Sequence, residues 1–438
     1  MRSSKLRRSF RLSPVCLILL ALAACSSTRP VTAPAAPVPP KTPRAPVPAQ
    51  ARAEGPVREA DEYTRYELLA PESAQFHILF EVTAITPGAT AYFNPIRKGS
   101  VASGESVKDL ATNQPLRFEV VSGEEARGSG LPEADPATDY IRVHLARPVP
   151  AEGGVRLLIE KTYKDAQSYF RKGADRIVFS RPLGIRRNAI VLPAGYEPVA
   201  CNAPAQVLTE RDGRVAVSFL HPGPEAFPLV IEARKTAPST GSKAPTGETD
   251  RLSERAHQDR TIVYFLRDPV THSFDLYHDY TESRPGVDRY LNVVRTGSTA
   301  SNPAARNLDT GEDLKVETLK GDAVLKNGPA ADEGVQPDSD VVVAHFPAVP
   351  PGGSVRLRIS ETYTDPKSYR LEGDELIFDR TFGRPRNAVI LPADWSLAAS
   401  SIPATVSETP DGRIRLDFLN PRPDEIAVLI KARRRAGR

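Results

Sequence analysis

Apolar and polar residues alternate with a period of two along many short segments of the chain. In segment 76–84 every second residue is apolar, and segment 215–219 has the same alternation. This period places alternate side chains on one face of a strand, whereas no long segment has the 3.6-residue period of an amphipathic helix. Strand-like segments recur at intervals of roughly 8 to 12 residues, a spacing typical of antiparallel β-sandwiches. The sequence therefore predicts an all-β fold.

Two segments, 206–220 and 405–419, are expected to form tight hairpins. Each has an Asp-Gly pair between two strand-like runs, at 212–213 and 411–412. Glycine adopts the positive φ that such turns need without steric cost. Two further glycines are expected to take positive φ in turns: Gly184 and Gly383.

The chain contains a tandem duplication with a period near 200 residues. Segment 155–169 matches segment 355–369 at a constant offset of 200, and segment 187–194 matches 386–393 after a one-residue slip. A period of this length exceeds that of a solenoid repeat or propeller blade, so each copy is expected to be a complete domain. The fold class is thus predicted to be two tandem homologous antiparallel β-sandwich domains.

Composition divides the rest of the chain into targeting and linking segments. Many of its 42 prolines lie before the first copy, where Pro and Ala dominate and no core can form. Such a segment populates extended polyproline II, at about 3.1 Å per residue. The expected organisation is a signal peptide at 1–24, a lipidated cysteine and Pro/Ala-rich stalk at 25–61, the first sandwich at 62–235, a linker at 236–259 and the second sandwich at 260–434.

The N-terminus combines a basic segment with a short apolar run that ends in Leu22-Ala23-Ala24-Cys25. The run is about half as long as a membrane-spanning helix, which favours a cleaved signal peptide. Its end resembles the lipobox of bacterial lipoproteins. The resemblance implies that Cys25 carries the lipid anchor, including acyl chains such as palmitate, and that the chain is held in the cell envelope. Ser26 after the cysteine implies sorting to the outer membrane, on its periplasmic or surface face.

The formal net charge of +4 comes mostly from the leader. Five basic residues precede Cys25, and removing them leaves 53 basic and 54 acidic residues. Phosphate binding needs a concentrated basic surface, so the mature chain is not expected to bind nucleic acid.

The chain lacks the common catalytic and metal-binding motifs, namely HExxH, GxSxG, the GK[ST] phosphate loop and CxxC. No cofactor or metal is expected. Cys201 is interpreted as a buried strand residue. His272 and His278, placed on one strand face, would lie about 20 Å apart, too far to share a metal.

A set of polar and aromatic residues stands at equivalent positions in both copies. One interpretation is a paired binding surface, in which Arg forks and Tyr rings contact a protein or glycan. The other is that Arg and Asn satisfy loop carbonyls while the tyrosines close sheet corners, which we favour because a duplicated domain retains what its fold requires. The set comprises Tyr163, Asp165, Ser168, Tyr169, Arg181, Arg187 and Asn188, with Tyr363, Asp365, Ser368, Tyr369, Arg380, Arg386 and Asn387.

Three functional hypotheses follow. The leading one is a non-enzymatic, lipid-anchored envelope protein that binds a protein partner or scaffolds an assembly. The second is a protein that binds wall or surface glycans, for which Trp395 and the aligned Tyr196 would be aromatic platforms. The third is a periplasmic hydrolase using carboxylates such as Asp165 and Asp365.

Overall fold

The computed structural model describes residues 58–222, 225–236, 253–326 and 334–435. All of them belong to one compact unit, which runs from Glu54 to Arg438. The expected signal peptide, Cys25, most of the stalk and most of the linker lie outside the described residues.

The described residues are almost entirely β, as predicted. The strands of the first repeat are β1 (Glu59–Leu68), β2 (Gln75–Ala84), β3 (Ala91–Pro95), β4 (Val101–Asp109), β5 (Gln114–Pro115), β6 (Phe118–Val121), β7 (Tyr140–His144), β8 (Val155–Lys164), β9 (Tyr169–Lys172), β10 (Arg176–Leu183), β11 (Arg187–Val191), β12 (Tyr196–Cys201), β13 (Gln206–Thr209), β14 (Val215–Leu220) and β15 (Phe227–Lys235). Those of the second are β16 (Thr261–Leu266), β17 (Ser273–Glu282), β18 (Arg289–Val293), β19 (Thr299–Asn307), β20 (Glu312–Leu314), β21 (Val316–Lys320), β22 (Asp340–His345), β23 (Val355–Thr364), β24 (Tyr369–Glu372), β25 (Glu375–Phe382), β26 (Arg386–Ile390), β27 (Trp395–Ser400), β28 (Thr405–Glu408), β29 (Ile414–Leu419) and β30 (Ile426–Arg434). The short helices are η1 (Pro71–Ser73), α1 (Gly123–Gly128), η3 (Pro269–Thr271) and α2 (Gly321–Lys326).

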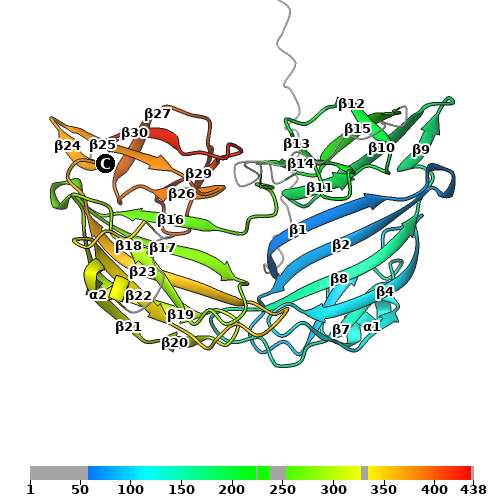
Figure 1. Cartoon of the computed structure of the whole chain (residues 1–438), viewed down its shortest axis with the longest axis horizontal. Helices are drawn as coiled ribbons and strands as arrows, with labels where there is room; N and C mark the ends of the chain where they lie inside the picture. Colours follow the sequence, from blue (N-terminus) through cyan, green and yellow to red (C-terminus); the bar gives the residue numbers. More distant parts are fainter. Residues whose placement is uncertain (1–57, 223–224, 237–252, 327–333, 436–438) are drawn as a thin grey trace, which may run out of the picture. The chain divides into compact units, whose positions relative to one another are not determined.

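The two repeats have the same sheet topology (Figure 1). In the first, an eight-stranded sheet has the order β13-β14-β11-β1-β2-β8-β4-β5, a four-stranded sheet the order β12-β15-β10-β9 and a three-stranded sheet the order β3-β7-β6. The second repeats this strand for strand, as β28-β29-β26-β16-β17-β23-β19-β20, β27-β30-β25-β24 and β18-β22-β21. The tandem β-sandwich prediction is therefore confirmed.

The pairing is antiparallel with one exception in each repeat. β1 pairs with β11 in parallel, and β16 pairs with β26 in parallel. The alternation of apolar residues could not reveal this, because side chains have a period of two in both kinds of ladder.

The core of each sandwich lies between the large sheet and the two smaller ones. In β2 the burial alternates strictly along the strand, as the sequence pattern predicts. Its Phe76 contacts Phe179 of β10 edge to face, with ring centroids 5.5 Å apart. In the second repeat, Phe274 and Phe378 make the same contact at 5.8 Å. These aromatic pairs fix the four-stranded sheet against the eight-stranded one.

Both predicted hairpins are present. β13 pairs with β14, and β28 with β29. Gly213 has φ +82° and Gly412 has φ +80°, so each closes its turn in the left-handed region. The expectation for Gly184 and Gly383 is wrong, because neither has a positive φ. There the chain changes direction in an adjoining bend that ordinary backbone angles allow.

The repeats extend slightly beyond the boundaries expected from the sequence. β1 begins at Glu59 rather than at residue 62. Part of the expected linker, residues 253–259, packs on folded strands, and there Arg255 and Ala256 are buried. Arg255 donates to the main-chain oxygens of Gly383 and Asn420, which attaches the segment to the second repeat.

Candidate functional site

In each repeat, one aspartate organises the turn between two strands. Asp165 follows β8, and its carboxylate accepts hydrogen bonds from Ser168 N (3.0 Å), Ser168 Oγ (2.6 Å) and Arg181 Nη1 (3.1 Å). Asp365 does the same with Ser368 N (3.0 Å) and Arg380 Nη1 (2.9 Å). Although burial opposes ionisation, the Ser168 hydrogen bonds and the Arg181 charge hold the pKa of Asp165 below its usual value.

The arginine of each set lies among aromatic rings inside the sandwich. Arg181 is 5.4 Å from the ring centroid of Phe76 and 5.5 Å from that of Tyr163. Arg380 is 5.3 Å from Phe274 and 5.6 Å from Tyr363. Cation–π contacts of this kind partly replace the hydration that a buried guanidinium loses.

The remaining members satisfy nearby main-chain groups. The Tyr169 hydroxyl donates to the main-chain oxygen of Leu69 (2.8 Å), and the Tyr369 hydroxyl donates to the main-chain oxygen of Arg267. Both tyrosines are fully buried. In the same way Asn188 Nδ2 donates to the oxygen of Ile185 (2.5 Å), and Asn387 Nδ2 to that of Arg384 (2.8 Å).

The sequence-predicted Tyr, Asp, Ser and Arg181 or Arg380 side chains therefore form a buried turn cluster in each sandwich. Asn188 and Asn387 instead bond the bend before their own strand, and Arg187 and Arg386 lie elsewhere. Contacts of this kind stabilise the fold of each sandwich. Whether any of these residues also binds a partner stays a prediction.

Arg187 and Arg386 both reach the region where the two repeats meet. Arg187 donates to the main-chain oxygens of Asp61 (2.7 Å), Glu62 (3.0 Å) and His257 (3.2 Å). Arg386 donates to the carboxylate of Asp61 (2.9 Å), so residues of both repeats meet at this aspartate.

The repeats contact each other reciprocally through main-chain hydrogen bonds. Gly154 N, before β8, donates to Leu308 O of the second repeat (2.8 Å), and Ser354 N, before β23, donates to Ala111 O of the first (3.2 Å). The approach is close enough that a Cβ on Gly153 would lie 2.1 Å from the oxygen of Leu308. Glycine is therefore required at this contact.

A buried ion pair reinforces this contact. Arg156 of β8 makes a bidentate interaction with Asp309 of the second repeat, at 2.6 and 2.9 Å. Its Nη1 also donates to Ser354 Oγ (2.9 Å). The side chains of Arg156 and Asp309 are only 7% and 5% exposed, so water weakens the pair little.

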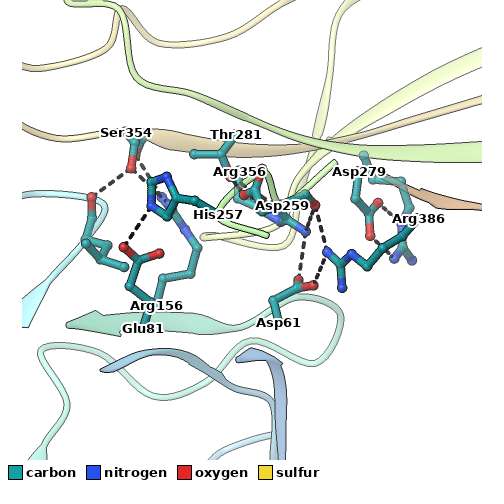
Figure 2. A network of polar contacts seen from close by, with 12 residues as sticks. Asp61, Glu81, Arg156, His257, Asp259, Asp279, Thr281, Ser354, Arg356 and Arg386 are labelled. Atoms are coloured by element: carbon teal, nitrogen blue, oxygen red, sulfur yellow. Dashed lines mark hydrogen bonds and ion pairs between the residues drawn. The ribbon is translucent and has the colours of Figure 1, made fainter. Parts of the chain in front are cut away.

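A second charge network surrounds Arg356 of β23 (Figure 2). Its guanidinium pairs with Asp61 (2.7 Å) and with Asp259, and it donates to Thr281 Oγ1 (3.0 Å). Although burial opposes ionisation, the charges of Arg356 and Arg386 hold the pKa of Asp61 far below its usual value. Asp61 is therefore an anion between two cations of the other repeat.

A β-bulge places Asp61 in this position. The register of β1 against β2 shifts between Ala60 and Tyr63, and Asp61 has φ +52°. A bulge turns the affected side chain away from the regular alternation. The carboxylate of Asp61 can then leave its own sheet and contact the second repeat.

Glu81 of β2 holds the segment that joins the repeats. It contacts His257 Nε2 at 3.2 Å. The hydrogen bond to Glu81 raises the pKa of His257 above its usual value, which favours the charged imidazolium.

Between these contacts lies a cavity of about 1130 Å³. Both repeats and the joining segment line it, including Glu81, Arg156, His257, Tyr280 and Arg384. This volume can hold a ligand of substantial size. We therefore treat the cavity as the candidate binding site.

Sequence reasoning found Arg187 and Arg386 but missed most of this site. A usable signal was present, because Arg156 and Arg356 occupy equivalent places in the duplicated Val-Arg-Leu segments. Asp61 in β1 and Asp259 just before β16 likewise occupy equivalent positions of the two repeats. Charged residues at duplicated positions of buried strands point to a shared polar contact.

Other residues singled out in the sequence lie elsewhere. Trp395 is 3% exposed and packs in the second core. Cys201 is half-buried in β12 rather than fully buried. His272 precedes β17 in the left-handed region, so the expected strand face does not include it, and its Nδ1 contacts Tyr369 O at 3.0 Å. His278 is 5% exposed and contacts the Tyr290 hydroxyl at 3.3 Å.

In the described parts of the chain, no three His, Cys, Asp or Glu residues are grouped so as to hold a metal ion. No helix in these parts is long and apolar enough to cross a membrane.

The sequence matches no protein-family model and no curated protein. Among solved structures, it is similar to an aminopeptidase N family protein from Idiomarina loihiensis, at 13% identity and a TM-score of 0.24, over 39% of this chain and 29% of that one. A two-domain M1 zinc metallopeptidase bound to L-tryptophan gives 17% identity and a TM-score of 0.25, over 39% and 41%. A collagen adhesin from S. aureus gives 7% identity and a TM-score of 0.14, over 73% and 84%. The chain thus spans less than half the length of either peptidase, and these similarities carry no functional argument.

Proposed function

We propose that this protein is a lipid-anchored component of the bacterial envelope whose two sandwich repeats act as one unit to bind a protein partner or scaffold an assembly. The observation that carries the proposal is the pair of buried charge networks between the repeats, around Arg156–Asp309 and around Arg356. Two independent domains joined by a flexible linker would need no such networks.

Buried ion pairs are weak evidence for stability, because desolvation offsets much of their attraction. Their geometric demands instead fix one arrangement of the charged partners. A fixed arrangement reduces the ordering cost of binding, so a surface formed by both repeats binds a partner more tightly than two freely moving domains would. We infer that the paired repeats serve this purpose.

The lipobox-like segment supplies the location. Two or three acyl chains on Cys25, at about 0.8 kcal/mol per buried methylene, make a stable anchor. The Pro/Ala-rich stalk would hold the repeats away from the membrane.

Anchoring is tested by metabolic labelling with an alkyne fatty acid and fractionation of the envelope. The intact chain is expected to take up label and sediment with outer membranes, whereas Cys25→Ser is expected to do neither. Unlabelled, soluble intact protein would refute the anchor.

Partner binding is tested by cross-linking and affinity capture of the tagged, lipidated protein in its native envelope. One stoichiometric protein partner is expected, retained by the control Arg422→Gln and lost in Asp309→Ala, which breaks the buried pair between repeats. Arg422 is suitable because its pair with Asp424 is exposed. Retention on wall or surface polysaccharide without a protein partner would replace the proposal with the glycan hypothesis.

A further inference from the structure

Two arginines of the cavity between the repeats differ from the others that line it. Arg156, Arg284 and Arg356 each pair with a carboxylate, and Arg187 donates to three main-chain oxygens. By contrast, no hydrogen bond or ion pair joins the guanidinium of Arg260 or Arg384 to any residue that the structure describes.

A neighbouring arginine shows what Arg260 lacks. Arg358 lies 4.0 Å from the ring centroid of Tyr277 and makes a bidentate pair with Asp279, at 2.8 and 2.8 Å. Arg260 lies 4.2 Å from the ring centroid of Tyr280 in the same strand, β17, but forms no ion pair with a carboxylate of the described residues. The two sites share the stacked ring and differ in the anion.

The acid that contacts Tyr280 on that strand is already occupied. Glu282 accepts from the Tyr280 hydroxyl (2.7 Å), and from Arg284 N (2.9 Å), Nε (3.0 Å) and Nη2 (2.7 Å). It therefore offers Arg260 little further capacity as an acceptor.

Arg384 shares this excess of positive charge. Its partial burial, together with the nearby charge of Arg260, lowers the pKa of Arg384. The adjacent His278 is kept neutral, because burial and the charges of Arg384 and Arg260 lower its pKa to about 3. Two cations in a partly desolvated space repel each other unless an anion lies between them.

The first repeat has no such pair. The strand registers align Arg260 with Glu62 and Arg384 with Ile185. The excess charge thus belongs to the second repeat and is not a requirement of the fold that the repeats share.

We propose that Arg260 and Arg384 bind an oxyanion, a phosphate or carboxylate group, on a ligand that enters the cavity between the repeats. Guanidinium groups bind both oxyanions through two parallel N–H donors. The cavity of about 1130 Å³ is far larger than one such group, so it leaves room for a larger molecule that carries the oxyanion. This inference goes beyond the proposed function and holds whether or not Cys25 is lipidated.

The test is calorimetric titration of the purified full-length protein with inorganic phosphate and, separately, with citrate, in chloride buffer of constant ionic strength. We expect saturable binding of at least one probe. Binding of phosphate alone or citrate alone assigns the oxyanion, and binding of both supports a site for either. In Arg260→Gln and in Arg384→Gln the affinity is expected to fall at least tenfold.

Arg358→Gln is the matched control, since it removes a stacked arginine that already has a carboxylate, and its affinity is expected to stay within twofold. If Arg384→Gln fails to fold, Arg384→Lys keeps the charge but loses the two-donor fork, and an affinity reduced at least threefold is expected. The proposal is overturned if the intact protein binds neither probe saturably, or if all variants bind equally. Displacement of the bound probe by glycerol 1-phosphate or by phosphatidylglycerol vesicles then separates a soluble ligand from a lipid headgroup.

Discussion

Arg156 and Asp309 form a buried, bidentate ion pair although 153 residues separate them in the chain. Each belongs to a different repeat, and the side-chain Oγ and main-chain oxygen of Ser354 accept the further hydrogen bonds of Arg156. The second sandwich therefore supplies the partners that a buried charge of the first sandwich needs.

Asp309→Ala is expected to lower the free energy of unfolding by about 3 to 5 kcal/mol, because it leaves the Arg156 charge buried without its partner. Chemical denaturation followed by far-UV circular dichroism measures the change. Arg422→Gln, which removes an exposed bidentate pair with Asp424, is expected to cost less than about 1 kcal/mol. Equal effects of the two substitutions would contradict the burial argument.

In the double variant Arg156→Met/Asp309→Leu, much of the lost stability is expected to return, because neither charge is then buried. A double variant as unstable as the single one would mean that Asp309 acts mainly through its hydrogen bond from Arg356 N.

Gly353→Ala is expected to loosen the contact between the repeats. A Cβ at this position would lie 2.4 Å from the main-chain oxygen of Ala111, and overpacking of this kind costs typically about 1 to 3 kcal/mol. Faster hydrogen exchange of the Ser354 amide, which donates to that oxygen, is the specific readout. Gly184→Ala is the control, since it meets open space and also lacks a positive φ. Unchanged exchange in Gly353→Ala would refute the close approach.

Lys161 and Glu361 occupy equivalent buried positions with opposite charges. An asparagine at equivalent positions of the two repeats contacts each of them: Lys161 Nζ donates to Asn94 Oδ1, whereas Asn292 Nδ2 donates to Glu361 Oε1 and Oε2 (2.9 and 2.8 Å). Burial penalises both charges, lowering the pKa of Lys161 to about 8 and raising the pKa of Glu361.

Relative to Lys161→Met, the intact protein is expected to gain about 3 kcal/mol of unfolding free energy as the pH rises from 8 to 10.5. Between these values the unfolded chain binds a proton that the folded chain has lost, so stability rises with pH. Denaturation midpoints of both proteins across this range measure the difference. A difference that does not change with pH would mean that Lys161 stays charged in the folded state.

Relative to Glu361→Gln, the intact protein is expected to lose stability as the pH rises above the ordinary value of 4.5, until the raised pKa of Glu361 is passed. Here the folded chain retains a proton that the unfolded chain has lost, so the sign is opposite to that for Lys161. The same denaturation experiment from pH 4 to 8 tests it, and an intact protein that gains stability relative to Glu361→Gln as the pH rises would contradict it.

The sequence by itself determined the class of the fold and its duplication. The period of two in segments such as 76–84 is a local property of a strand with one buried face, and the repeated Asp165 and Asp365 turns are copies of the same local geometry. Each of these patterns depends only on a short segment of the sequence, so it can be recognised without knowledge of distant contacts.

Only the tertiary structure decided which charged residues meet. Nothing in the segment around Arg156 indicates that its partner is Asp309, because pairing across 153 residues depends on how one folded sandwich approaches the other. The parallel pairing of β1 with β11, the bulge that turns Asp61 toward the second repeat and the position of Arg260 and Arg384 in the wall of the cavity have the same origin. The sequence does not show whether a given carboxylate or guanidinium is hydrated or buried against a partner. Long-range packing decides this, because it is what removes the water.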